Sequence, residues 1–391
     1  MKQASQLHWP SLDGLRGLAI LMVILHNTEL LDGVRLAFPD RAVEYVFDAG
    51  WIGVILFFAL SGFLITGILL DTADLPHAFR NFVVRRALRI FPLYYGMLVL
   101  IFWVLPAFHA QPALYAAEVP HQIWLWTYLY NWTGVLYKGP DSLPHFWSLS
   151  VEEQFYLVWP LLVLGLKRPV RVAWACLIVA TVSVVCRDLF YRQGVPPDVI
   201  YSWSITRVDA LAFGGLAAAF LRHAPAAAWL KQHRQGAAWT LLAVFVLSAV
   251  VTHNFPRTTL LGMVLGYTVI AVTCAGIILA STRLDAIARQ AHEPSGSSPA
   301  SPPAMPFWHR CLTWRPLQSV GKYSYGMYVF HKPLHENFSR LVLSKLGWQP
   351  AGHLLVAVLH LGLLTVITYG LAWLSYHLYE VHFLRLKRYF T

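Results

Sequence analysis

The stretch Pro144-His-Phe-Trp-Ser-Leu-Ser-Val-Glu-Glu-Gln-Phe-Tyr-Leu-Val-Trp-Pro160 places two adjacent carboxylates, Glu152 and Glu153, in a run that otherwise reads as membrane-spanning. An ionisable side chain inside a membrane helix costs roughly 2.5–3.5 kcal/mol on insertion scales. Such residues mark functional sites by default, and further charged residues lie in other apolar runs of the chain. The stretch therefore predicts a polytopic membrane protein whose helix bundle carries chemistry.

The composition of the whole chain agrees with this class. Of its 391 residues, 57% are hydrophobic and 13% are charged, whereas a typical soluble domain has about 25% charged residues. The formal net charge of +11 fits Lys and Arg in cytoplasmic loops better than nucleic-acid binding, because no folded basic domain is evident. The four cysteines follow neither a disulfide pattern nor a metal-site pattern, so we predict no metal and no nucleic-acid partner.

Ten segments are long and apolar enough to cross a bilayer, which takes about 20 residues. We predict an all-α polytopic membrane protein, with about ten transmembrane helices in one domain over residues 1–391. The segment 121–137 is short and rich in Trp and Tyr, which prefer the membrane interface, so we expect a re-entrant or interfacial segment there. The predicted spans are 12–32, 50–70, 92–109, 146–166, 172–190, 203–221, 237–253, 258–280, 317–335 and 352–377.

The distribution of Lys and Arg between the loops predicts the orientation. With ten spans, one set of loops and ends carries 18 basic residues and the other set carries 8. The richer side is expected to be cytoplasmic, which places both termini in the cytoplasm. A Pro- and Ser-rich stretch predicts a flexible cytoplasmic loop at about 284–307. Any chemistry is then expected in the bundle itself.

Two charged motifs suggest roles in catalysis and in binding. His26 lies ten residues after Arg16, about 15 Å further along a helix. A neutral imidazole tolerates burial and can act as a general base near neutral pH; otherwise it only bonds a neighbouring helix. Arg86 and Arg89 share one helix face and can clamp a phosphate, or they are ordinary cytoplasmic charge near lipid headgroups.

Spans six and nine carry the remaining charged candidates. Arg207 and Asp209 are two residues apart and do not face each other on a helix, so each is expected to pair with another helix. Glu152 or Glu153 is a natural partner for Arg207, and the alternative is a purely structural ion pair. Lys322 begins span nine at the inner side. His331 reaches the outer third of the same span, where it supports a substrate or ends the helix at the interface.

The predicted topology separates these groups by depth. Arg86 and Arg89 are expected at the inner face, below a cluster of ionisable residues. An anion clamp inside and an ionisable cluster outside would suit a phosphorylated donor in the cytoplasm and an acceptor beyond the membrane. The cluster expected in the outer half consists of His26, Glu152, Glu153, Arg207, Asp209 and His331.

Six segments, in order along the chain, resemble the motifs of acyltransferase family 3, whose membrane proteins modify cell-surface and secreted glycans. Each segment is a weak signal by itself, but six in order from residue 12 to about 388 identify the chain as a member. The segments are Leu12-Asp-Gly-Leu-Arg-Gly-Leu-Ala, Phe57-Phe-Ala-Leu-Ser-Gly-Phe-Leu-Ile, Arg86-Ala-Leu-Arg-Ile-Phe-Pro, Phe146-Trp-Ser-Leu-Ser-Val-Glu-Glu-Gln-Phe-Tyr, Arg207-Val-Asp-Ala-Leu and Tyr323-Ser-Tyr-Gly-Met-Tyr-Val-Phe-His.

The resemblance implies an integral O-acyltransferase in a membrane of the bacterial inner-membrane type. Its donor would be cytoplasmic acyl-CoA, most often acetyl-CoA, and its acceptor a hydroxyl of a carbohydrate such as an exopolysaccharide, lipopolysaccharide or other glycan or glycolipid. No permanently bound cofactor is implied. The candidate residues are His26, Glu152 and Glu153 for catalysis, Arg86, Arg89 and Arg16 for binding the donor, and Asn27, Arg207, Asp209, Lys322 and His331 for substrate or structural support.

The spacing in the first span departs from the family pattern. The family separates its arginine and histidine by eleven positions, about 20° from the same helix face, and this chain has Asn27 there. His26 is ten positions after Arg16 and lies about 80° round the helix from it. Either a π-bulge restores the register, or Asn27 takes the family position and His26 works from the next face. The alternative function is a transporter or flippase, which would show broken half-helices in two matching repeats. The sequence has no such repeat.

Overall fold

The computed structural model describes residues 8–27, 49–136, 142–291, 305–338 and 354–390. Within these ranges the chain is helical, without a strand. The long helices are α1 (Pro10–Asn27), α3 (Ile52–Thr72), α4 (Ala78–Val99), α9 (Phe146–Leu166), α10 (Pro169–Arg192), α12 (Ser204–Arg222), α13 (Ala224–Val251), α14 (Tyr267–Gln290), α16 (Arg315–Phe338) and α18 (Leu354–Ser375). The short segments are η1 (Ala49–Trp51), η2 (Leu100–Val104), α5 (Leu105–Ala107), α6 (Ala113–Glu118), η3 (Val119–His121), α7 (Ile123–Trp126), η4 (Tyr130–Trp132), α8 (Thr133–Leu136), α11 (Pro197–Ser202), η5 (Gly262–Gly266), α15 (Phe307–Leu312), η7 (Tyr376–Glu380), α19 (Val381–Arg385) and η8 (Leu386–Tyr389).

Each predicted span coincides with a long helix, apart from residues 28–32 and 352–353, which lie outside the described ranges. Among the described residues, 8 helical stretches are long and apolar enough to cross a membrane. Helices α1 and α16, at the predicted first and ninth spans, are more polar and are not among the eight. The all-α polytopic class is confirmed, whereas the number of spans and the side of the termini stay predictions.

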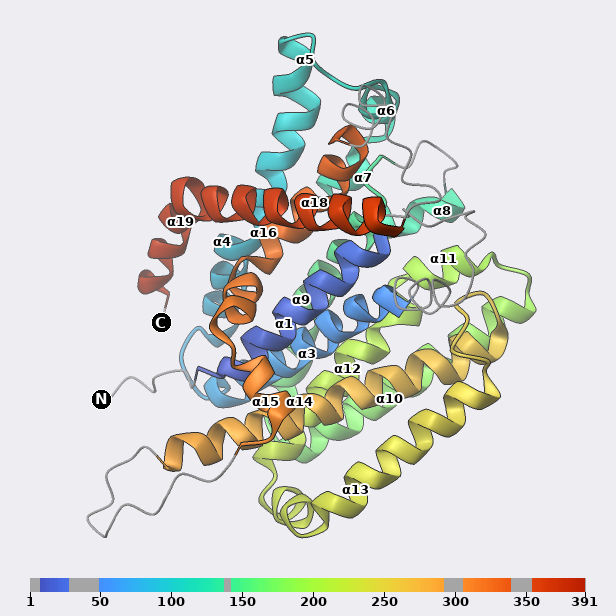
Figure 1. The fold of residues 1–391 in the computed structure, drawn as a ribbon. Coiled ribbons are helices and arrows are strands. Elements are labelled where there is room, and N and C mark those ends of the chain that lie inside the picture. The colour runs from blue at the N-terminus through green and yellow to red at the C-terminus, as the bar shows by residue number, and fades with distance from the viewer. Residues whose placement is uncertain (1–7, 28–48, 137–141, 292–304, 339–353, 391) are drawn as a thin grey trace.

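Figure 1 shows how the helices are arranged. Helices α1 and α3 run side by side through the middle of the bundle, with α10, α13 and α14 towards one side and α4, α16 and α18 towards the other. The outer helices expose large apolar side chains, for example Leu161 of α9, Trp174 of α10 and Val250 of α13. An apolar surface of this extent suits the hydrocarbon of a bilayer rather than water.

The third span is longer than predicted. Instead of the segment 92–109, one continuous helical stretch runs from Ala78 through α4, η2 and α5 to Ala107. The arginines in its first half lower the local hydropathy, so a hydropathy window misses that half. Arg86 and Arg89 follow Ala78 by eight and eleven residues, about 12 and 16 Å along the axis. Both arginines line a cavity between the helices of the bundle, and their predicted place at the inner face of the membrane stays a prediction.

The aromatic segment 121–137 forms no long helix over its described part, 121–136. It folds into short helical pieces, and several side chains of the long helices hold its backbone. Tyr94 of α4 donates a hydrogen bond through its hydroxyl to the Leu125 carbonyl at 2.7 Å, and Gln154 of α9 donates to the Tyr128 carbonyl at 2.8 Å. The segment packs against α4 and α9, in line with the prediction that it is not a span.

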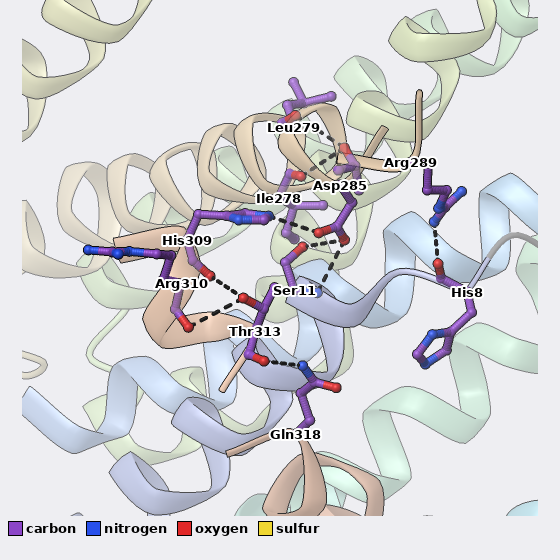
Figure 2. A network of polar contacts seen from close by, with 11 residues as sticks. His8, Ser11, Ile278, Leu279, Asp285, Arg289, His309, Arg310, Thr313 and Gln318 are labelled. Atoms are coloured by element: carbon purple, nitrogen blue, oxygen red, sulfur yellow. Dashed lines mark hydrogen bonds and ion pairs between the residues drawn. The ribbon is translucent and has the colours of Figure 1, made fainter. Parts of the chain in front are cut away.

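The loop predicted at 284–307 is partly helical. Helix α14 continues to Gln290, and residues 292–304 lie outside the described ranges. Figure 2 shows that Asp285 ties this helix to α1 and α15: its Oδ2 accepts hydrogen bonds from the Ser11 amide at 3.1 Å and hydroxyl at 2.7 Å, and its Oδ1 lies 2.8 Å from His309 Nε2. Buried carboxylates are costly unless they are bonded in this way. Residues 284–290 therefore form part of the helical framework that anchors the start of α1.

Two glycines allow α3 and α12 to pack closely. A Cβ at Gly62 would lie 1.9 Å from the Leu211 carbonyl oxygen, and one at Gly214 would lie 2.0 Å from the Ala59 carbonyl oxygen. Small residues at such crossings let membrane helices approach each other.

We expect Gly62→Ala to force α3 and α12 apart and to destabilise the protein by about 1–3 kcal/mol, as overpacking does. The thermal unfolding midpoint of the detergent-purified protein measures the loss. The matched control is Gly165→Ala in α9, whose Cβ would meet nothing within 4 Å. Equal midpoints for the two variants would contradict the close packing of α3 on α12.

Candidate active site

A small buried cavity of about 100 Å³ lies between α1, α3, α4, α9 and α16, and we name it the central cavity. Its charged lining residues are Arg16 of α1, Arg86 and Arg89 of α4, and Glu152 of α9. Three guanidiniums and one carboxylate converge on this space, so it favours negative charge on a ligand or a reacting group. The remaining lining residues are Val54, Phe57, Phe58, Leu60, Ser61, Leu64, Ile90, Ser148, Leu149, Tyr156, Ser324, Tyr325 and Tyr328.

The local contacts of the three arginines differ. Arg16 Nη1 lies 2.8 Å from Asp13 Oδ1, so its charge is partly compensated. The Arg86 guanidinium lies over the Tyr156 ring, 4.8 Å from the ring centroid, a favourable cation–π contact. Within the described residues, neither Arg86 nor Arg89 forms an ion pair. Both guanidiniums can therefore interact with an anionic group that enters the cavity.

Glu153 faces a different space from Glu152. It lines a second cavity of about 210 Å³, together with Tyr128, Gln154 and Arg86. Adjacent residues on a helix point about 100° apart, so two neighbouring carboxylates cannot both face the central cavity. Glu153 Oε1 is buried without a hydrogen-bond partner in the described part of the chain. Burial raises the pKa of the nearby Tyr128 phenol, which keeps the phenol neutral.

A larger cavity of about 560 Å³ opens beside the central cavity, and we name it the basic vestibule. The two cavities share Arg16, Arg89 and Tyr325 in their linings, so they lie side by side with these side chains between them. Arg315 and Lys322 of α16 and Lys387 of η8 add three more cations. The other lining residues are His8, Asp13, Gln318, Ser319, Tyr323, Gly326, Ala372, Tyr376, Glu380 and Leu384.

A third cavity, of about 380 Å³, contains histidines, and we name it the histidine cavity. It shares Val54 and Tyr328 with the central cavity. Tyr328 donates a hydrogen bond to the His145 carbonyl at 2.8 Å, and its hydroxyl lies 2.5 Å from Ser148 Oγ. These contacts hold the phenol where the two cavities meet. The lining residues are His26, Asn27, Val54, Glu118, Tyr130, Thr133, Gly134, Pro144, His145, Trp147, Asp198, Val199, Tyr201, Ser202, Arg257 and Tyr328.

His26 and Asn27 both line the histidine cavity, and Asn27 also contacts His331 of α16. Asn27 Nδ2 lies 3.2 Å from His331 Nε2, and His331 Nδ1 lies 2.7 Å from the Tyr328 carbonyl oxygen. A carbonyl accepts a hydrogen bond, so Nδ1 carries the proton and Nε2 accepts from the Asn27 amide. The His145 ring lies 4.8 Å from the His331 ring, centroid to centroid. Asn27 thus positions a second histidine at the edge of the cavity that His26 lines.

The structure does not gather all the predicted residues in one cavity. Glu152 lies in the central cavity with the arginines, Glu153 lines the cavity beside Tyr128, and His26 lies in the histidine cavity. Neither glutamate lines the cavity of His26, so the three residues predicted for catalysis do not share one cavity. Lys322, in turn, lines the basic vestibule.

The expected pairing of Arg207 with Glu152 or Glu153 is wrong. Arg207 lies among aromatic rings, with its guanidinium 4.6 Å from the ring centroids of both Tyr201 and Tyr267. Asp209 pairs instead with Arg187 of α10, at 2.7 Å between Oδ2 and Nη1, and both side chains are buried. Cation–π contacts offset part of the cost of burying the Arg207 charge, while its Nε and Nη2 are buried without a hydrogen-bond partner among the described residues. Arg207 and Asp209 support the packing of α12.

Sequence reasoning missed several residues of these cavities. His145, Tyr328 and Tyr156 lie inside motifs that were noticed for their charged neighbours. Arg315 and Lys387 were counted only as loop charges. His145 could have been found from the sequence, because it directly precedes the Phe-Trp-Ser motif and lies three residues before Ser148.

The chain folds into a helical bundle of membrane type, in which the central cavity with its arginines lies between the basic vestibule and the histidine cavity. A membrane protein of this class can bring two substrates together within its bundle. The comparison with protein families makes the class specific: the acyltransferase domain family matches residues 9–377. The chain therefore belongs to acyltransferase family 3, and the resemblance found in the sequence is confirmed.

Individual relatives agree with this assignment. The chain is similar to "Putative peptidoglycan O-acetyltransferase YrhL" of Bacillus subtilis, with 30% identity over 95% of this chain and 54% of the relative. It is also similar to the peptidoglycan O-acetyltransferase OatA of Listeria monocytogenes, with 27% identity over 84% of this chain and 50% of that protein. The chain thus spans about half the length of these curated relatives. No solved structure matches it.

Proposed function

We propose that the chain is an integral membrane O-acyltransferase that moves an acetyl group from acyl-CoA to a carbohydrate hydroxyl, with peptidoglycan as the first acceptor to test. The observation that carries the proposal is a row of three adjoining cavities with charged or histidine side chains in their linings. Arg16, Arg89 and Tyr325 join the basic vestibule to the central cavity, and Val54 and Tyr328 join the central cavity to the histidine cavity. The names of the relatives support acetyl as the acyl group and peptidoglycan as the acceptor.

The order of the three cavities suggests a mechanism. The donor enters the basic vestibule from the side richer in Lys and Arg and places its thioester in the central cavity. The acceptor hydroxyl approaches from the histidine cavity and attacks the thioester carbonyl carbon near Tyr328. A C–O bond forms, the C–S bond breaks, the hydroxyl proton passes to a histidine, and CoA leaves as its thiolate. Arg86 and Arg89 stabilise the negative charge that develops on the carbonyl oxygen and on sulfur.

His26 is the proposed general base, because it lines the acceptor cavity directly. General-base catalysis typically contributes about 10²–10⁴-fold, so we expect His26→Ala to lower the rate of acetyl transfer by that factor. The rate with labelled acetyl-CoA, at equal amounts of folded protein, measures the loss. His233→Ala serves as the control, because His233 is exposed on α13 and lines none of the cavities described above. Wild-type rates for His26→Ala would move the base to His145 or His331.

The experiment for the function as a whole uses membranes that contain the protein, radiolabelled acetyl-CoA and purified peptidoglycan fragments. We expect label to enter the glycan as an ester that mild base removes. Glycan that crosses the membrane without gaining label would instead favour the alternative function, a transporter or flippase. A parallel assay with exopolysaccharide and lipopolysaccharide ranks the acceptors.

A further inference from the structure

The basic vestibule and the central cavity differ in size, and the difference suits them to different parts of a donor. Pockets for drug-sized ligands typically enclose about 300–1,000 Å³. The basic vestibule, at about 560 Å³, has room for a nucleotide, whereas the central cavity, at about 100 Å³, has room only for a small group. Arg86 lines the central cavity and not the vestibule. Arg89 lines both cavities, so Arg86 is the member of the pair that is poorly placed to hold the phosphates of a bulky donor.

The vestibule has cations of its own that lack anionic partners. Arg315, Lys322 and Lys387 line it from two separate segments of the chain. Within the described residues, none of the three forms an ion pair. The two acidic residues of the vestibule are already engaged: Asp13 is paired with Arg16, and Glu380 accepts a hydrogen bond from Ser375 Oγ at 3.1 Å. Three basic side chains without a carboxylate partner around one cavity suit a ligand that carries several phosphates.

The vestibule also has an aromatic wall. The rings of Tyr323 and Tyr376 contact each other edge to face, with 5.3 Å between centroids. Lys322 Nζ lies 5.0 Å from the first ring centroid and 4.9 Å from the second. Tyr376 opens the π-helical turn Tyr376–Glu380, and such turns occur frequently at functional sites. Two phenol rings beside an ammonium group offer both a stacking surface for a base and a contact for a phosphate.

We infer that the vestibule binds the phosphorylated nucleotide end of the donor, with Arg315, Lys322 and Lys387 on its phosphates and Tyr323 and Tyr376 beside its base. Arg86 and Arg89 then meet the thioester end in the central cavity. The inference rests on the proposed function and deepens it, because it divides the donor between two sets of residues.

The test compares two donors. Acetyl-CoA carries the nucleotide and its phosphates, whereas acetyl-pantetheine carries the same thioester without them. In the triple variant Arg315→Ala/Lys322→Ala/Lys387→Ala, we expect KM for acetyl-CoA to rise at least about tenfold, since hydrogen bonds to charged groups are strong. We expect kcat/KM for acetyl-pantetheine to stay within about twofold of wild type. Calorimetric titration of adenosine 3′,5′-bisphosphate into protein in nanodiscs should show a matching loss of affinity.

Two further variants complete the design. Arg80→Ala/Lys231→Ala/Arg234→Ala removes the same amount of charge from exposed positions outside the vestibule, and it should keep the wild-type KM. Lys322→Arg should retain most of the affinity for the nucleotide, because it keeps the positive charge. The thermal midpoint of each variant confirms that the protein is folded.

Three results would overturn the inference, and they are distinguishable. An unchanged KM for acetyl-CoA in the folded triple variant would remove the phosphate site and leave the acyltransferase in place. An equal loss with both donors would assign the three cations to the reaction itself. A wild-type protein that neither binds the bisphosphate nor transfers acetyl from acetyl-CoA would overturn the proposed donor, and the inference with it.

Discussion

Replacing Arg86 and Arg89 together with alanine is expected to slow acetyl transfer by about 10²–10³-fold or more, the loss seen when preorganised donors to an oxyanion are removed. Both side chains line the central cavity, where the thioester is proposed to react. The loss should appear in kcat with both acetyl-CoA and acetyl-pantetheine, because it concerns the reacting end of the donor. Initial rates at saturating donor, normalised to folded protein, measure it.

Two matched variants separate the chemistry from the packing. Arg85 lies next to the pair but lines none of the cavities described above, and its Nη1 donates to the Phe390 carbonyl at 3.2 Å. Arg85→Ala should therefore keep a near wild-type kcat. Arg86→Lys/Arg89→Lys keeps the charge but loses the planar fork, so we expect intermediate rates. A folded Arg86→Ala/Arg89→Ala variant with a wild-type kcat would contradict the proposed role of the arginines.

Arg187→Ala is expected to cause a large loss of stability, about 3–5 kcal/mol, as the breaking of a buried ion pair does. The change leaves Asp209 buried without its cation. It also removes the donors to the Thr206 carbonyl, at 2.9 Å, and to Thr268 Oγ1, at 2.7 Å. The unfolding midpoint and the yield of monodisperse protein in detergent measure the effect.

The chain offers a matched control for this prediction. Arg192 and Asp188 form an exposed pair four residues apart on α10, at 2.8 Å, and such pairs contribute only about 0.3–0.5 kcal/mol. Arg192→Ala should therefore leave the midpoint almost unchanged. The double variant Arg187→Met/Asp209→Leu should recover much of the stability, because no charge stays buried alone. A midpoint for Arg187→Ala close to that of Arg192→Ala would contradict the structural importance of the buried pair.

The long helices were predictable because hydropathy over about 20 residues identifies membrane spans with little help from tertiary structure. The misplaced start of the third span shows the limit of that signal. Arg80 and Arg85 lie in the first half of α4, and their charge conceals a helix from a hydropathy window. Polar helices such as α1 and α16 were still found, since their apolar residues outnumber the charged ones.

The grouping of the site residues was less predictable. The family resemblance pointed to residues of all three adjoining cavities, including Arg16 for the basic vestibule, Glu152 for the central cavity and His26 for the histidine cavity. A sequence does not show which way a helix is turned, so Glu152 and Glu153 were treated as a pair although they line different cavities. The partner of Asp209 was missed for the same reason, because Arg187 lies on another helix.

The structure shows where Asn27 and His26 lie in the first span, whose arginine–histidine spacing departs from the family pattern. Asn27, at the position where the family has its histidine, bonds His331, while His26 lines the same cavity beside it. The chain therefore brings His26 and His331 to this region from two helices. The His26→Ala rates decide whether His26 accepts the proton.

The most direct measurement uses the purified protein in sealed liposomes, with a soluble peptidoglycan oligomer trapped inside and radiolabelled acetyl-CoA added only outside. The proposed transfer across the adjoining cavities, from the basic vestibule to the histidine cavity, predicts base-labile acetyl ester on the trapped oligomer, and free CoA outside. Ester formed only when donor and acceptor share one compartment, and none on the trapped oligomer, would contradict transfer through the bundle.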